Sequence, residues 1–222
     1  MKIYFDIETI PTQSQQAIAM IAAEIKPPAQ MKKPETIAEW EATQKQSAID
    51  EAVLKTSFDG ALGQICCIGL AIDDHPAQAF IGQESDILIA FGNALEAAYD
   101  PSKNVPPVFI GHNVSAFDLR FLFQRYVING IKPPRFIPFN DKSWSERIFD
   151  TMTYFSGYGN RISLDKLSLA LGLEGKGGIT GADVWPMYQA GKIQDIADYC
   201  IHDVDLTREV EKRLTFTSNK PI

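Results

Sequence analysis

The segment IYFDIET, residues 3–9, places two carboxylates inside a run that is typical of a buried β-strand. Side chains alternate between the two faces of a strand, so Asp6 and Glu8 share one face and the apolar residues around them share the other. Two like charges this close repel each other, and burial also strips them of hydration. A bound cation would remove both penalties. The alternative is a strand end that emerges into solvent where Pro11 stops it.

The composition is that of one large globular domain. The chain has 222 residues, 45% hydrophobic and 22% charged, so we expect residues 1–222 to form a single domain with a sizeable core. No apolar run approaches the roughly 20 residues that span a bilayer, and the first strand leaves no room for a signal peptide. Three cysteines do not make a disulfide framework. We therefore expect a cytoplasmic protein with reduced thiols and no membrane partner.

The charge distribution argues against binding of polyanions through bulk charge, because the net charge is −7. It is uneven, however. Residues 120–176 contain 9 Lys and Arg against 5 Asp and Glu, whereas residues 1–119 contain 7 against 16. The middle of the chain could therefore offer a local basic surface on an acidic body, although ordinary surface variation explains any single residue there.

The order of expected elements predicts an α/β fold with a mixed sheet of about five strands and helices packed on it. We expect strands at 2–8, 63–72, 77–82, 106–113 and 147–155, and helices at 85–99, 115–130, 163–173 and 193–214. Residues 12–57 form an expected helical insertion after the first strand, with helices at 13–25 and 36–55. Thr36 and Glu39 have the spacing of a capping box at the start of the second. Residues 174–185 are expected to form a flexible loop.

The closing helix carries an acid where an apolar residue is expected. At about 100° per residue, one stripe of this helix is apolar and the opposite side is acidic. Asp203 falls on the apolar flank, and Tyr199 lies one turn before it, so their side chains are neighbours. A buried acid needs a partner, which is either a metal ion or a distant arginine or backbone amide.

A fourth acid, Asp118, follows an apolar strand and the turn GHN at 111–113. Ser115 and Asp118 match a loose capping box, so Asp118 could simply begin a helix. The position also suits a ligand site, because ligands of α/β sheets bind at the ends of central strands and helix N-termini favour anionic groups.

These acids and the tyrosine resemble, in this order, the motifs of the DEDD superfamily of 3′→5′ exonucleases, which have a ribonuclease H-like fold. The histidine branch of that superfamily has its catalytic His where this chain has Asp198, so the resemblance is to the tyrosine branch. DIETIP and YCIHDVDLT resemble in particular the stand-alone bacterial and phage exonucleases related to the proofreading domain of family B DNA polymerases. The motifs are FDIET with Asp6 and Glu8, GHNVSAFD with Asp118, and YCIHD with Tyr199 and Asp203.

The resemblance implies hydrolysis of single-stranded DNA from its 3′ end with two divalent metal ions, Mg²⁺ or Mn²⁺. One ion, held by Asp6, Glu8 and Asp203, would activate the attacking water. The second, held by Asp6 with support from Asp118, would stabilise the leaving 3′ oxygen. Carboxylate oxygens favour these ions over zinc. Tyr199 would orient the water, because a tyrosine with an unperturbed pKa near 10 is a poor base at neutral pH.

The resemblance also implies a substrate pocket. Thr9 and Ile10 would contact the terminal nucleotide, with Ile10 packed on its base. His112, Asn113 and Phe117 would line the same pocket. The alternatives are a plain strand-end turn for residues 111–113 and core packing for Phe117.

Four further residues have weaker expectations. Lys176 either approaches a phosphate or is a solvated loop lysine, and Asp150 and Asp165 have structural roles near the site. Trp40 in the insertion either packs against its neighbours or stacks on a base. The insertion itself is expected to shape access of the substrate and to take no part in the chemistry.

Several other functions remain open or are disfavoured by the motifs. A 3′→5′ exonuclease acting on RNA would have the same residues, and a non-catalytic nucleic-acid-binding or proofreading accessory subunit would work with replication or repair proteins. A phosphatase with an Asp nucleophile requires D-x-D-x-[TV], which DIET does not match. The chain has no Walker A motif, no G-x-S-x-G elbow and no C-x-x-C, and its three histidines are far apart, which argues against a zinc site.

Overall fold

The computed structural model describes residues 1–175 and 177–217, and its centre is one mixed sheet of five strands in the order β3-β2-β1-β4-β5. β1 pairs antiparallel with β2 and parallel with β4, β2 pairs antiparallel with β3, and β4 pairs parallel with β5. This arrangement confirms the expected ribonuclease H-like α/β fold. The strands are β1 Lys2–Ile10, β2 Gln64–Ile72, β3 Gln78–Ile81, β4 Val108–Gly111 and β5 Ile148–Asp150.

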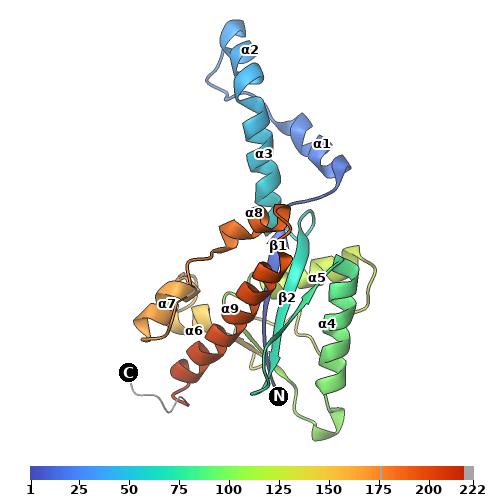
Figure 1. The fold of residues 1–222 in the computed structure, drawn as a ribbon, viewed down its shortest axis with the longest axis vertical. Coiled ribbons are helices and arrows are strands. Elements are labelled where there is room, and N and C mark those ends of the chain that lie inside the picture. Colours follow the sequence, from blue (N-terminus) through green and yellow to red (C-terminus); the bar gives the residue numbers. More distant parts are fainter. Residues whose placement is uncertain (176, 218–222) are drawn as a thin grey trace.

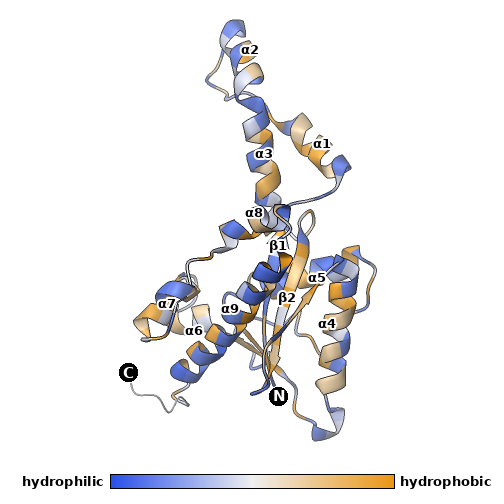
Figure 2. Ribbon diagram, in the orientation of Figure 1, coloured by the Kyte–Doolittle hydropathy of each residue, from blue (hydrophilic) through white to orange (hydrophobic). Residues whose placement is uncertain are grey.

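Helices cover both faces of the sheet (Figure 1). Figure 2 shows the hydrophobic residues gathered on the strands and α4, while α9 is hydrophilic along part of its surface. Short 3₁₀ turns η1 Thr56–Phe58, η2 Pro101–Lys103 and η3 Gly181–Asp183 join the elements. The helices are α1 Gln15–Glu24, α2 Pro34–Thr43, α3 Lys45–Lys55, α4 Glu84–Ala98, α5 Asp118–Ile128, α6 Thr151–Ser156, α7 Leu164–Ala170, α8 Val184–Gln189 and α9 Ile193–Leu214.

The alternation of β1 divides the core as its sequence predicts. Ile3, Phe5 and Ile7 pack into the cluster that contains the buried residues of α4 and α5. Tyr4, on the other face, packs with Val204 of α9. Asp6 and Glu8 share the face of Tyr4 and therefore lie on the α9 side of the sheet.

Glycine at position 69 lets α9 come unusually close to the sheet. Gly69 lies opposite Asp6 in the β1–β2 register. A Cβ atom at this position would lie 2.8 Å from Val204 Cγ2 and 3.0 Å from both the carbonyl oxygen and Sγ of Cys200. Any side chain would therefore push α9 away from the strand that carries the two acids.

The C-terminal half of α9 is anchored by a buried polar group that the helical pattern did not indicate. Glu211 is buried; it accepts a hydrogen bond from the Tyr4 hydroxyl (3.1 Å) and pairs with the Lys2 ammonium (2.9 Å). Arg208, also buried, lies over the Tyr4 ring and donates to the carbonyl of His75. These contacts tie the last turns of the helix to the first residues of β1.

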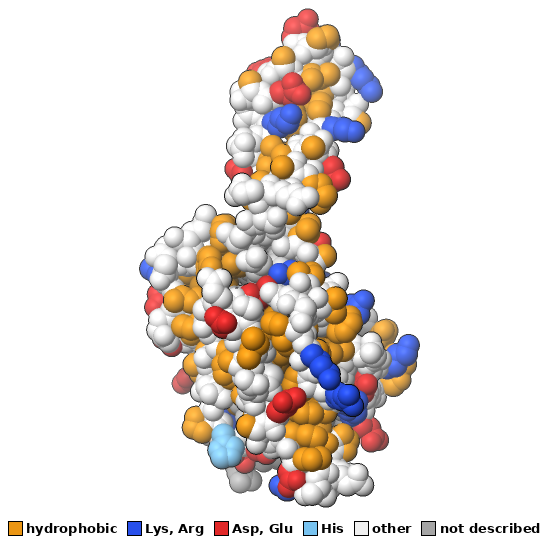
Figure 3. Space-filling view, turned by 90° about the vertical axis from the view of Figure 1, so that its right-hand side faces the viewer, with side chains coloured by type: hydrophobic (Ala, Val, Ile, Leu, Met, Phe, Trp, Pro, Cys, Tyr) orange, Lys and Arg blue, Asp and Glu red, His pale blue; other side chains and the backbone are white. Residues whose placement is uncertain are grey.

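The residues between β1 and β2 form a helical arm, made of α1, α2 and α3, that extends beyond the end of β1 (Figure 1). In Figure 3 it is a narrow column above the body, with basic, acidic and hydrophobic side chains intermixed. Trp40 is buried inside the arm, which favours the packing interpretation over stacking on a base.

Several local expectations were wrong. The helix expected at 36–55 is two helices that meet at Gln44, whose backbone leaves the helical region (φ −121°, ψ −22°). The first of them begins at Pro34 instead of at a Thr36–Glu39 capping box, because proline is well suited to the first helical position. The strand expected at 147–155 ends at Asp150, whose carboxylate caps α6. The loop expected at 174–185 extends into the unanticipated helix α8.

Among the residues that the structure describes, no helix is both long and apolar enough to cross a membrane.

Substituting Gly69 by alanine should lower the free energy of unfolding by about 1–3 kcal/mol, because the new methyl group would crowd the Val204 side chain and the α9 backbone at Cys200. The midpoint of urea unfolding measures the effect. Gly181→Ala is the control, since a Cβ atom there meets nothing within 4 Å. Equal stability of the two variants would contradict the tight α9 contact.

Candidate active site

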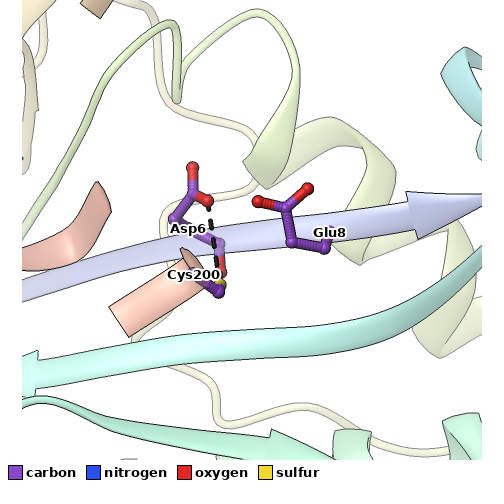
Figure 4. A group of neighbouring side chains, drawn as sticks. All are labelled: Asp6, Glu8 and Cys200. Atoms are coloured by element: carbon purple, nitrogen blue, oxygen red, sulfur yellow. Dashed lines mark hydrogen bonds between the residues drawn. The ribbon is translucent and has the colours of Figure 1, made fainter. Parts of the chain in front are cut away.

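Asp6 and Glu8 form the first part of the site. Both carboxylates project from the same side of β1, and Cys200 of α9 lies beside Asp6 (Figure 4). One oxygen from each and the Sγ atom of Cys200 all lie within 4.8 Å of one another. Glu8 is buried and Asp6 is half-buried. The predicted juxtaposition of the two acids is therefore present.

Asp118 reaches the same strand from the N-terminus of α5. Its Oδ1 accepts a hydrogen bond from the amide of Ile7, the residue between the two strand acids (3.2 Å). Asp118 is 3% exposed, and burial raises the pKa of its carboxyl well above the ordinary value, with repulsion from Asp6 adding to the effect. The Ser115–Asp118 capping box is not formed, because the Ser115 hydroxyl donates to Asp150, but Asp118 does begin α5 as that alternative expected.

Asp150 organises the turn that delivers Asp118. Its carboxylate accepts hydrogen bonds from the amides of Asn113 (3.0 Å) and Ser115 (3.1 Å) and also caps α6. Asn113 has a left-handed backbone (φ 63°), which asparagine tolerates better than most residues. The structural role expected for Asp150 is thus confirmed.

Tyr199 and Asp203 come from α9, one helical turn apart. Both are buried, as the position of Asp203 on the apolar flank predicted. The Tyr199 hydroxyl donates to the Asp203 carboxylate. Burial, followed by the charges of Glu8 and Asp203, raises the pKa of Tyr199 far above 10. This shift favours the protonated hydroxyl, which can orient a water molecule, over a phenolate base.

The donor atoms of this cluster suit a hard divalent cation. The acids provide carboxylate oxygens, which are the ligands that Mg²⁺ and Mn²⁺ prefer. Cys200 also touches the site, and its thiol donates weakly to the backbone oxygen of Asp6 (3.5 Å). Burial and the neighbouring Cys67 raise the pKa of the Cys200 thiol, and sulfur is in any case a softer ligand than Mg²⁺ and Mn²⁺ prefer. The residues present thus fit the expected ions.

Beside the acids lies a cavity of about 810 Å³ that is lined by Tyr199, His112 and Asn113, among others. The His112 ring is held between the Thr151 hydroxyl (3.0 Å) and the carbonyl of Ile162 (2.9 Å). Two of the expected substrate residues, His112 and Asn113, therefore face a space large enough for a nucleotide.

The other expected substrate residues differ in exposure. Thr9 is half-buried and its hydroxyl donates to the carbonyl of Ser57 (2.7 Å). Phe117 is half-buried against Phe58. Ile10, by contrast, is 2% exposed and packs with Tyr199 and other residues of the α9 side. Little of the Ile10 side chain is therefore exposed for packing on a nucleotide base.

The cavity also contains residues that the sequence did not single out. Phe58, at the base of the arm, is 74% exposed and lines the cavity together with Met152 and Arg161. The signal that could have found Phe58 was an aromatic residue directly after the insertion. Asp165 lines the cavity as well. Lys176 lies outside the described residues.

The raised pKa of Asp118 predicts a pH-dependent stability in metal-free protein. Above about pH 4, the folded state binds more protons at Asp118 than the unfolded state, so parent stability should fall as pH rises towards the folded pKa. Asp118→Asn lacks this group and keeps an oxygen that can accept from Ile7. In EDTA, urea unfolding should show that the stability of the variant relative to the parent increases as pH rises. A stability difference that does not change with pH would contradict this.

Comparisons with known proteins agree with the fold. No curated protein matches the chain. Its fold matches a family B DNA polymerase from the hyperthermophilic archaeon Pyrobaculum calidifontis, with a TM-score of 0.61 and 14% identity, over 96% of this chain and 24% of the polymerase. The chain therefore spans about a quarter of that protein. Residues 62–214 match the family described as "Predicted 3'-5' exonuclease related to the exonuclease domain of PolB". Because the match covers most of the chain, the protein belongs to this family of exonucleases.

Proposed function

We propose that the protein is a metal-dependent 3′→5′ exonuclease of the tyrosine branch of the DEDD superfamily, acting on single-stranded DNA. The observation that carries this proposal is the convergence of buried carboxylates from β1, α5 and α9 beside a hydroxyl that keeps its proton. The FDIET motif lies outside residues 62–214, which match the family. The roles proposed for Asp6 and Glu8 are therefore supported by their positions in the fold and not by that match.

The proposed roles divide the acids between two cation positions. Asp6, Glu8 and Asp203 would hold one divalent ion, and Asp6 with Asp118 in support would hold the other. When bound, Mg²⁺ or Mn²⁺ would supply activation of the attacking water and stabilisation of the leaving 3′ oxygen. Asp118 is well suited to a supporting role because its oxygen already accepts from the Ile7 amide.

Tyr199 would position the attacking water through its hydroxyl. Burial and the neighbouring acids keep that hydroxyl neutral, which supports orientation over proton removal. Its bond to Asp203 holds it at the edge of the proposed cation site.

A DNA substrate is supported by the match of this chain to part of a DNA polymerase. The cavity beside Tyr199 would receive the 3′-terminal nucleotide, with His112, Asn113 and Phe58 around it and Phe117 packed against Phe58. An enzyme acting on RNA would show the same cluster of acids.

The decisive experiment uses matched single-stranded DNA and RNA labelled at the 5′ end, with Mg²⁺, Mn²⁺ or EDTA. We expect a ladder of products shortened from the 3′ end, with DNA preferred and no products in EDTA. Faster cleavage of RNA would reassign the substrate. Binding without cleavage under all metal conditions would favour a non-catalytic module, and release of phosphate alone would favour a phosphatase.

Asp6→Ala should abolish hydrolysis while leaving the protein folded, because Asp6 is proposed to contact both ions. Circular dichroism establishes the fold and the labelled strand reports the activity. Asp198→Ala, which removes an exposed acid from the opposite side of α9, is the matched control and should retain the parent rate. Near-normal turnover by a folded Asp6→Ala protein would overturn the assignment.

Tyr199→Phe and Asp203→Asn should fail in different ways. In Tyr199→Phe, loss of the hydroxyl should slow the single-turnover rate by about 10- to 1,000-fold. The effect should be larger on kcat than on KM. Replacing the carboxylate should instead weaken Mn²⁺ binding, which titration calorimetry measures. A parent-like rate in Tyr199→Phe would leave the third motif with a metal-binding role alone.

A further inference from the structure

An exposed aromatic surface adjoins the candidate site on the side of β5. Trp144 is 72% exposed and Tyr158 is 76% exposed, and their rings meet edge to face with centroids 6.2 Å apart. Tyr154 is exposed beside them, against Phe149 of β5. Large aromatic side chains are costly to leave in water, so a cluster of them marks a surface that binds something. We call Trp144, Tyr154 and Tyr158 the aromatic face.

The aromatic face is continuous with the cavity beside the acids. That cavity shares Asn113, Met152 and Arg161 with a second hollow of about 350 Å³. The second hollow shares Ser143, Thr153 and Tyr158 with a third, of about 470 Å³, which is lined by Trp144 and Tyr154. Three adjoining hollows therefore form a track from Tyr199 to Trp144.

Cations accompany this track. Lys142 lies over the Trp144 ring, with its Nζ 5.9 Å from the centroid, and Arg161 lines the first two hollows. Both are exposed, and within residues 1–175 and 177–217 neither forms an ion pair. Glu146 is an acid on the third hollow. The track runs through the part of the chain where Lys and Arg outnumber acids by 9 to 5.

We infer that the aromatic face binds the unpaired strand on the 5′ side of the nucleotide being removed. The inference rests on the proposed function, which places the 3′ end at the acids. Exposed rings combined with basic side chains along a groove suit single-stranded nucleic acid, because unpaired bases offer free faces for stacking and phosphates need cations. A duplex is disfavoured because its bases are stacked and offer no free faces along its length. A peptide bound at the edge of β5 is disfavoured because it would not extend into the cavity beside the acids.

Binding is tested in the full-length Asp6→Ala protein, which cannot shorten the probe. Fluorescence anisotropy of a labelled oligothymidylate dodecamer gives Kd for the Asp6→Ala protein. The same measurement is made on Asp6→Ala proteins that also carry Trp144→Ala, Tyr158→Ala or Phe216→Ala. Loss of one stacking contact should weaken binding by about 5- to 100-fold. Phe216 is 95% exposed at the far end of α9 and serves as the control. Trp144→Tyr, which preserves a ring, should recover most of the affinity.

Activity provides the second measurement in the otherwise native protein. For Trp144→Ala, kcat/KM on the dodecamer should fall relative to kcat/KM on a trinucleotide, which offers far fewer bases to the aromatic face, whereas Phe216→Ala should keep the parent ratio. Equal losses on both lengths would show that Trp144 supports the fold and would overturn the inference. Unchanged dodecamer affinity in Trp144→Ala would overturn it as well. If the parent failed to hydrolyse DNA, the proposed function would be wrong. Binding of the dodecamer that depends on Trp144 would still support the inference that the aromatic face binds single strands.

Discussion

The close approach of α9 to β1 and β2 is the contact on which the candidate site depends. At Gly69 the helix backbone and the Cys200 and Val204 side chains occupy the space that any Cβ would need. This places Tyr199 and Asp203, one turn apart, against the face of β1 that carries Asp6 and Glu8. A wider gap between helix and sheet would separate carboxylates whose shared function requires them to be near one another.

That proximity carries an electrostatic cost in the folded protein. Buried acids repel one another and lose hydration, which the raised pKa of Asp118 expresses directly. The fold offsets this cost elsewhere. The opposite face of β1 packs into the apolar cluster under α4 and α5, and Glu211 ties the far end of α9 to Lys2 and Tyr4. Contacts made elsewhere in β1 and α9 thus help to hold the acids together, and a divalent cation would relieve the repulsion between them.

The surroundings of the acids come from separate parts of the chain. Phe58 stands at the base of the arm, His112 and Asn113 follow β4, and Arg161 precedes α7. These segments meet to form one continuous surface. We propose that this surface binds both the terminal nucleotide and the DNA on its 5′ side. The net negative charge of the protein does not conflict with a polyanionic substrate, because recognition would rest on local cations, stacking and bound metal ions.

The sequence by itself determined the features that follow from local periodicity. The two-residue repeat of β1 placed Asp6 and Glu8 on one face, and the helical repeat of 193–214 placed Asp203 on the buried flank within the correct bounds. Only the tertiary structure decided the remainder. It removed Ile10 from the surface, exposed Phe58 beside the cavity, buried Glu211, and made Asp150 end its strand and organise the turn before Asp118. Apart from the end of the strand at Asp150, which caps α6 locally, each of these outcomes depends on a partner far away in the sequence, and local patterns contain no information about which distant residue will provide that partner.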